Sequence, residues 1–266
     1  MIQDSFALSP GSPLRLRQVG VVTRDPKPVE DILTEVLGLE LAERFPGIDQ
    51  YGLGTAFFPI GNQFFEVVHS AVTGTSADRL IEKRGGDTGF IVMLETLDLD
   101  AVKATAYMLG IRIVDSLENA KGKYLQFHPN DVGGTLLAVY EIAGDDAGAA
   151  DGAWMYGGDQ WKRARRTDVV SGIAEVVIEC KTPQLVAQTW LQLAGGELAE
   201  APTGQLLQLT GTTIRFVAGR EDRGLTELSL VASDVAQIWE RVNSFSSAWA
   251  KGLCRIGGLD VVFEES

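Results

Sequence analysis

The chain has 266 residues, 45% hydrophobic side chains and a formal net charge of -13. That length is sufficient for one large or two medium cores. The acidic balance opposes binding to a polyanion, so nucleic acid is not an expected partner. No apolar run approaches the length of a membrane helix, and the N-terminus lacks the basic-then-apolar pattern of a signal peptide. A cytoplasmic protein with no membrane partner is therefore expected.

Two cysteines, Cys180 and Cys254, fall in different expected elements and form no CxxC motif. This spacing favours reduced structural thiols over a disulfide or a zinc site. The one basic cluster, Lys162–Arg166, leaves two alternatives open. The cluster either lies in a solvated linker or forms inter-domain ion pairs, or it binds a phosphate or a coenzyme tail.

An internal repeat organises the sequence. The stretch Arg17–Pro26, a β-branched run followed by a polar residue and proline, returns in altered form as Glu175–Pro183. Leu37–Glu43 is echoed by Ala194–Glu200 at the same separation and without a gap. A repeat of this length indicates that the second half of the chain copies the plan of the first.

The first half predicts two βαβββ units. Residues 1–14 are expected to be a loose N-terminal arm, and a polar loop rich in Gly, Ser and Thr is expected between the units. The helix of the first unit begins at Asp25-Pro26 and ends at Gly38. The strands of the first unit are expected at 14–23, 39–44, 51–58 and 63–69. The second unit is expected as a strand at 88–94, a helix at 98–109 and strands near 112, 124–127 and 135–140.

Residues 142–169 are expected to form a linker whose aromatic residues pack against one of the domains. The second half then repeats the plan. Its elements are expected as a strand at 172–179, a helix at 183–194, a hairpin turning at Thr210-Gly211, a strand at 225–231, a helix at 234–243 and a strand at 258–264.

This plan resembles the vicinal oxygen chelate (VOC) superfamily, which includes glyoxalase I, bleomycin-resistance proteins, extradiol dioxygenases and methylmalonyl-CoA epimerase. Three features support the resemblance: the four repeated units, the segment Gln18–Val22 on the first strand, and the segment Leu37–Glu40 at the end of the first helix. The segment Phe127–Leu137 is similar to the His-Pro ending of the epimerase-like branch. The resemblance implies an α+β fold of two cupped, mixed β-sheet barrels. The implied domains are 15–141 and 170–266, after an arm at 1–14 and joined by the linker at 142–169.

The resemblance also implies four metal-ligand positions in each half. In the first half, Gln18 and Glu66 supply oxygen donors, whereas Gly89 or Phe90 stands at the third position and Ala138 at the fourth. Two oxygen donors without an imidazole make a poor site for zinc, nickel or cobalt. No cofactor is therefore expected, and a divalent metal (Mg, Mn, Zn or Ni) on Gln18 and Glu66 is the less favoured alternative.

In the second half, the repeat maps these positions to Glu175, Arg215, Glu227 and Val262. If the first unit paired with the fourth, Gln18, Glu66 and Glu227 would meet as an oxygen-only site for Mg²⁺ or Mn²⁺. Neighbouring units are expected to pair along the chain instead. The extradiol dioxygenase chemistry needs two histidines and a carboxylate. The two histidines of this chain, His69 and His128, stand at none of the implied positions, which argues against that chemistry.

Each candidate residue has a functional and a structural interpretation. Glu66 is a candidate base that abstracts a proton α to a carbonyl, or it hydrogen-bonds Gln18. His128 is a candidate acid or base, or a turn residue satisfied by backbone hydrogen bonds. Glu175, Arg215 and Glu227 form either an ion-pair network that fills the second cup or a pocket in which Arg215 clamps a carboxylate or phosphate. Aromatic walls for an apolar ligand are expected at Phe57, Phe58, Phe64 and Phe90.

Two functions remain open at this stage. The first is a divergent epimerase- or lyase-like enzyme acting on a small carbonyl compound or acyl thioester, with catalytic Glu66 and His128. The second is a metal-free binding or sequestration protein of the bleomycin-resistance type. Either function implies a small-molecule partner, and a homodimer is a further expectation. The fold alone does not decide between the two functions, because this fold hosts many chemistries.

Overall fold

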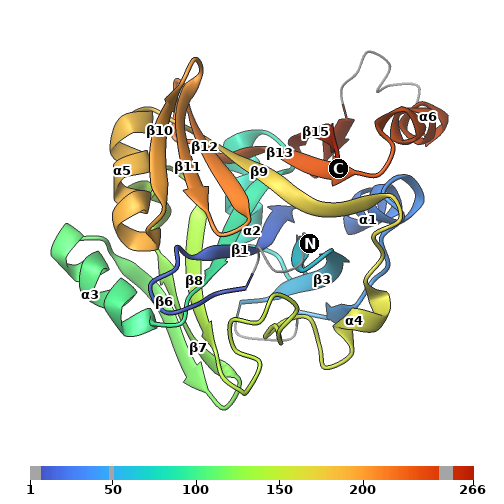
Figure 1. Cartoon of the computed structure of the whole chain (residues 1–266). Helices are drawn as coiled ribbons and strands as arrows, with labels where there is room; N and C mark the ends of the chain where they lie inside the picture. Colours follow the sequence, from blue (N-terminus) through green and yellow to red (C-terminus); the bar gives the residue numbers. More distant parts are fainter. Residues whose placement is uncertain (1–6, 48–50, 246–253) are drawn as a thin grey trace. The chain divides into compact units, whose positions relative to one another are not determined.

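A computed structural model describes residues 7–47, 51–245 and 254–266, and it confirms a mixed α+β fold of repeated units (Figure 1). The first three units have the order βαβββ, and the described residues of the fourth have the order βαββ. The strands of the first half are β1 (Arg15–Val22), β2 (Glu43–Phe45), β3 (Leu53–Ile60), β4 (Gln63–Ser70), β5 (Thr88–Glu95), β6 (Ile113–Asn119), β7 (Gly122–Phe127) and β8 (Leu136–Ile142). The strands of the second half are β9 (Val170–Cys180), β10 (Glu197–Ala201), β11 (Gly204–Leu209), β12 (Thr212–Ala218), β13 (Gly224–Ala232), β14 (Cys254–Ile256) and β15 (Leu259–Glu265).

The helices are short. One helix follows the first strand of each unit, and the others lie in the connecting segments. They are α1 (Pro26–Asp31) with a π-helical continuation η2 (Ile32–Val36), α2 (Ser76–Arg84), α3 (Leu99–Leu109), the 3₁₀ turn η3 (Pro129–Asp131), α4 (Trp161–Ala164), α5 (Pro183–Ala194) and α6 (Val235–Phe245). Within the described residues, none of these helices is long and apolar enough to span a bilayer.

The strands form two mixed sheets, one from each half of the chain. The strand order is β2-β3-β4-β1-β5-β8-β7-β6 in the first sheet and β10-β11-β12-β9-β13-β15-β14 in the second. The first and second units therefore meet at β1 and β5, and the third and fourth at β9 and β13. Consecutive units share a sheet, as the sequence predicts.

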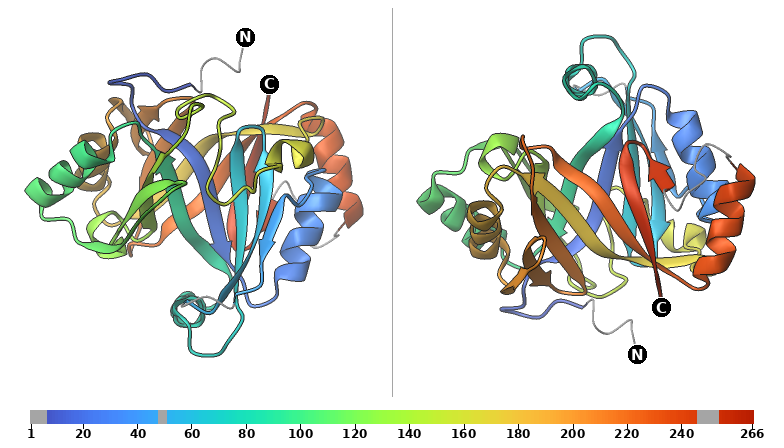
Figure 2. Two further views of the ribbon diagram at one scale, coloured as in Figure 1. Left: turned by 90° about the horizontal axis from the view of Figure 1, so that it is seen from below. Right: turned by 90° about the horizontal axis from the view of Figure 1, so that it is seen from above.

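The chain also divides into two compact bodies, each built from separate segments. Body A contains the segment ending at Gln18, Ile91–Met155 and Glu175–Leu225, and thus the second and third units. Body B contains Val19–Phe90, Tyr156–Ala174 and the segment beginning at Thr226, and thus the first and fourth units. In body A, α3 lies beside α5, and in body B, α6 lies beside η2 (Figure 2). The domain boundaries at 15–141 and 170–266 remain a prediction.

Each unit starts its helix at a polar residue that follows the first strand, because such residues cap free amide groups. The side chains of Asp25, Asp98 and Asp234 accept hydrogen bonds from the backbone of Lys27, Ala101 and Gln237, and α5 begins with Thr182-Pro183. The hairpin turns after β3 and β11 contain Gly61 and Gly211, both with positive φ, as the sequence predicts.

One element contradicts the prediction. The polar loop expected between the first two units contains helix α2, which begins with a capping box formed by Thr75 and Asp78. Its residues Ala77 and Ile81 are buried against Val22 and Val68 of body B. The Gly, Ser and Thr residues around α2 favour a loop by composition, whereas the capping box and two apolar contacts decide for a helix. Strand β2 also begins four residues later than expected.

Both cysteines are reduced and buried in strands, Cys180 in β9 and Cys254 in β14. Burial raises the pKa of the Cys180 thiol to about 11 and that of Cys254 to about 12. At pH 8 almost no thiolate is present, so neither group is an effective nucleophile.

We therefore expect neither cysteine to react with Ellman's reagent in the native protein, and both to react in denaturant. Absorbance of the released thiolate measures this directly. Rapid modification of one thiol without denaturant would contradict the buried placement of that cysteine.

Candidate functional site

The four units carry equivalent positions on their first strands. In three units this position, seven residues before the helix cap, holds a polar residue that the repeat singles out. These residues are Gln18 before Asp25, Glu175 before Thr182 and Glu227 before Asp234. The cap spacing of the folded chain therefore supports the equivalences read from the sequence.

The same spacing revises the second unit. Asp98 caps α3, and the residue seven positions earlier is Ile91, rather than Gly89 or Phe90. Ile91 is buried in β5, and its neighbour in the parallel register is Leu136 of β8. Ala138, expected at the fourth position, is also buried. Both positions carry hydrocarbon side chains with no donor atom for a metal.

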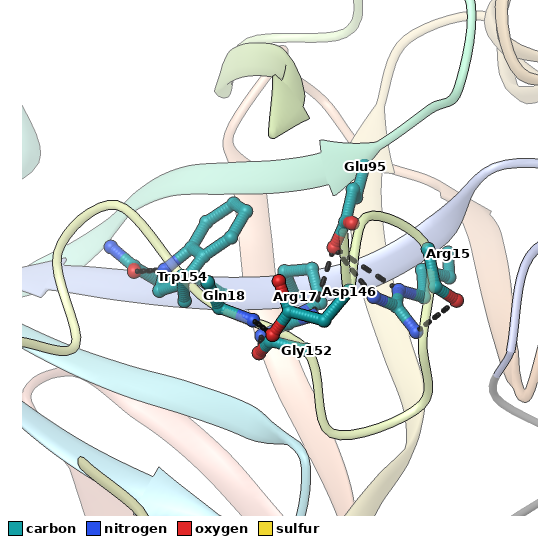
Figure 3. Close-up of polar contacts among 9 residues, drawn as sticks. Arg15, Arg17, Gln18, Glu95, Asp146, Gly152 and Trp154 are labelled. Atoms are coloured by element: carbon teal, nitrogen blue, oxygen red, sulfur yellow. Dashed lines mark hydrogen bonds and ion pairs between the residues drawn. The ribbon is translucent and has the colours of Figure 1, made fainter. Parts of the chain in front are cut away.

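Gln18 is buried completely and faces the linker. Its Oε1 accepts a hydrogen bond of 2.7 Å from Nε1 of Trp154 (Figure 3). The Trp154 ring lies 5.1 Å from the Tyr140 ring and 5.0 Å from the Arg17 guanidinium. The amide oxygen at the first implied ligand position is therefore bonded to a tryptophan of the same chain.

Next to Gln18 lies a buried ionic cluster that the sequence does not reveal. One carboxylate oxygen of Glu95 accepts from Nε and Nη2 of Arg15, at 3.1 and 2.9 Å, and from Nη1 of Arg17, at 2.9 Å. All three side chains are about 1% exposed. Two buried cations thus share one buried anion in body A (Figure 3).

The linker completes this cluster. Nη1 of Arg15 donates to the carbonyl of Gly148 at 3.3 Å, and Nη2 of Arg17 donates to the carbonyl of Gly152 at 3.2 Å. Burial lowers the pKa of Arg17 to about 10, while Glu95 and Asp146 act in the opposite direction. Arg15 and Arg17 stand one residue apart on β1, and no motif links them to Glu95 about 80 residues later. The cluster could not be predicted from the sequence, because nothing along the chain indicates that these three charged side chains are buried together.

Glu66 lies on a strand face that linker aromatics cover. It is 6% exposed, and its cross-strand neighbour on β3 is Phe57. Tyr156 stacks on Phe57 with ring centroids 5.6 Å apart. Phe64, which shares the face of Glu66, is buried and contacts Trp161 at 5.1 Å. The prediction that linker aromatics pack against a domain is confirmed for this face.

Two further candidates have structural environments. Phe90 packs against the apolar cluster that includes Val22 and α2. His128 precedes η3, and its Nδ1 accepts from the backbone N of Asn130 at 3.2 Å and from Arg112 at 3.1 Å. Arg112 is held in turn by both carboxylate oxygens of Asp131. This geometry of His128 is that of a turn residue. A catalytic role for His128 and a ligand-binding role for Phe90 stay predictions.

The third unit presents a more open face. Nε and Nη2 of Arg215 donate to one oxygen of Glu175, at 2.8 and 2.7 Å, and the two side chains are 24% and 20% exposed. The strand register places Val177, Leu206 and Val217 on the same face. The opposite face holds Ile214 and Phe216, which are fully buried. We call the face with Glu175, Val177, Leu206, Arg215 and Val217 the Arg215 face.

The fourth unit lies in body B and is considered by itself. Glu227 is partly exposed and lies opposite Asp260 of β15. Val262, at the fourth implied position, is 46% exposed. Among the described residues of this unit, no group of three His, Cys, Asp or Glu side chains is placed to hold an ion.

The donor set does not fit the metal that the family resemblance implies. Among the residues that the structure describes, no three His, Cys, Asp or Glu side chains are grouped to hold an ion. In the first half, Gln18 and Glu66 are the only two of the four positions with donor atoms, and Gln18 bonds Trp154. A divalent metal requires several converging donors.

Fold and site together define a duplicated βαβββ protein without the full set of metal ligands. Residues 15–139 match the family model described as "Glyoxalase/Bleomycin resistance protein/Dioxygenase superfamily". The first half of the chain, residues 15–139, therefore matches this superfamily, the VOC superfamily.

Solved structures agree with the fold. A hypothetical protein from Staphylococcus aureus matches with a TM-score of 0.65 at 13% identity, over 95% of this chain and 100% of that one. A variant of 4-hydroxymandelate synthase from Streptomyces coelicolor matches with a TM-score of 0.67 at 11% identity, over 96% and 93%. Methylmalonyl-CoA epimerase from Mycobacterium tuberculosis covers 53% of this chain and 96% of its own, at 22% identity, but its TM-score of 0.45 is too low to bear on function. No curated protein matches the chain.

The Glu95 cluster makes a quantitative prediction. Replacing Glu95 by Gln leaves two buried guanidinium groups without a counter-charge, so we expect the free energy of unfolding to fall by roughly 3–5 kcal/mol. Urea denaturation measures this change.

The matched control is Glu30→Gln, which removes a two-pronged pair with Arg44 at the surface. Because that pair is solvated, its loss is expected to cost less than about 1 kcal/mol. Equal losses in the two variants would contradict the buried-cluster assignment.

Proposed function

We propose that the chain is a metal-independent small-molecule-binding protein, and that its ligand binds at the Arg215 face. The observation that carries this proposal is the difference between equivalent positions in the two halves. Gln18 and Glu66 are 0% and 6% exposed, whereas the side chains of their equivalents Glu175 and Arg215 are 20% and 24% exposed. The second half thus retains an accessible polar group at the position where the first half is covered.

The chemistry of the Arg215 face indicates the class of ligand. Leu206 and Val217 offer a partly exposed apolar surface, and Arg215 offers a planar cation suited to a carboxylate or phosphate. In the free protein Glu175 neutralises that cation. A ligand with an apolar body and one anionic group would therefore compete with Glu175 for the guanidinium.

Octanoate is a suitable probe for this surface. We expect it to raise the melting temperature of the protein by mass action, with no change when EDTA is present. Arg215→Gln is expected to abolish the shift. Glu175→Gln is expected to enlarge it, because the competing carboxylate is removed while the cation remains.

The control is Arg255→Gln, which breaks a comparable exposed pair with Asp260 on β14 and β15. That variant is expected to keep the octanoate shift. A shift that survives Arg215→Gln, or one that vanishes with EDTA, would contradict the proposal.

The alternative function is an epimerase- or lyase-like activity with Glu66 as base and His128 as acid or base. The favouring observation is that Glu66 is buried beside Phe57 and Phe64, since an apolar environment stabilises the neutral carboxyl and suits a base that works near neutral pH. Tyr156 and Trp161 cover the same aromatic side chains, which opposes substrate access.

Hydrogen exchange decides between the two functions. With methylmalonyl-CoA as an acyl thioester probe in D₂O, the binding proposal predicts no enzyme-dependent deuterium uptake at the α-carbon by NMR. Uptake that disappears in Glu66→Gln, while that variant keeps its melting temperature, would establish the enzyme instead.

A further inference from the structure

The side chain of Trp154 is bound as a ligand would be bound. Three groups from two strands surround its ring: Gln18 and Arg17 of β1 and Tyr140 of β8. We propose that the linker segment Asp146–Trp154 is an intramolecular ligand, and that the socket around Trp154 is a binding site for an N–H heteroaromatic of indole type. This proposal concerns the first half of the chain and does not depend on ligand binding at the Arg215 face.

Each wall of the socket recognises a different property of an indole. The Gln18 oxygen accepts the ring N–H at 2.7 Å, which requires a donor in the plane of the ring. The Arg17 guanidinium lies 5.0 Å from the ring centroid, within the range of a cation–π contact. Tyr140 packs at 5.1 Å with an interplanar angle of 60°, and its own ring rests on Tyr124 at 4.9 Å. A polar, a cationic and an aromatic contact thus converge on one ring.

The backbone before Trp154 is folded so that it places the indole ring in the socket. Asp146 accepts from the backbone N of Ala153 at 2.8 Å, and Arg17 holds the carbonyl of Gly152. A Cβ at position 152 would lie 2.4 Å from the carbonyl oxygen of Asp146, so the loop closes only around glycine. The buried arginines therefore fix the loop, and the loop places the indole.

Arg17 uses only part of its donor set for hydrogen bonds within the described residues. Its Nε has no hydrogen-bond partner, although the side chain is 1% exposed. Leaving a buried donor unpaired is costly. The position of Arg17 is therefore set by contacts with Glu95, Gly152 and the Trp154 ring rather than by full satisfaction of its own donors.

The test removes the internal ligand and supplies it in solution. We expect Trp154→Gly to lower the melting temperature by several degrees and added indole to restore a large part of that loss. 1-Methylindole has the same ring system without the N–H. It is expected to bind the variant roughly tenfold more weakly, because it cannot donate a hydrogen bond to the buried Gln18 oxygen. The wild-type protein is expected to show no shift with either compound.

The matched control is Trp161→Gly. Trp161 belongs to the same linker and is equally buried, but it packs on Phe64 through its ring. A cavity at that position is expected to bind indole and 1-methylindole alike. In Trp154→Gly combined with Gln18→Met, the preference for indole is expected to disappear.

Two results would overturn the proposal: equal stabilisation of Trp154→Gly by both compounds, or stabilisation by neither. If the variant is insoluble, the same comparison is made as the yield of folded protein after dilution from urea. Recovery with indole and not with 1-methylindole supports the proposal, and equal or absent recovery with the two compounds refutes it.

Discussion

The carboxylate of Glu95 and the two arginines that share it are the constraint on which body A depends. A buried anion is costly unless it is paired and hydrogen-bonded, and here one oxygen receives three N–H groups. The cluster links the neighbouring strands β1 and β5 of the first sheet. One further nitrogen of each guanidinium donates to the carbonyl of Gly148 or Gly152. The same charges that pair with Glu95 therefore also hold the linker.

Once the linker is fixed in this way, the two halves of the repeat differ in what they can do. In the first half, Gln18 bonds Trp154, and the face of Glu66 carries aromatic side chains that pack on Tyr156 and Trp161. In the second half, Arg215 and Glu175 remain partly exposed on their strands. Duplication supplies two sets of equivalent positions, and the linker covers one of them. This asymmetry is the physical basis for assigning binding to the second half.

Much of the fold could be predicted from the sequence because its information is local. Most strand positions, the cap Asp25 and the glycine turns at 61 and 211 depend on a few neighbouring residues, and they are confirmed. Helix α2 was missed because composition outweighed its capping box. The partners in the candidate site are distant in sequence: Gln18 and Trp154 are separated by 136 residues, and Arg15 and Glu95 by 80. No pattern along the chain encodes such a pair, so their chemistry emerges only from the fold.

The chemistry of Gln18 explains why family membership does not determine function here. A buried amide oxygen needs a donor, which a metal provides when the other ligand positions also carry donor atoms. Ile91 and Ala138 carry none, so in this chain an ion would gain too few ligands to repay its dehydration. The N–H of Trp154 satisfies the same oxygen with a single hydrogen bond and adds the burial of an indole ring. The missing donors at two positions and the docked tryptophan are therefore consistent with each other, since the N–H of Trp154 takes the place at the Gln18 oxygen that a metal would otherwise occupy.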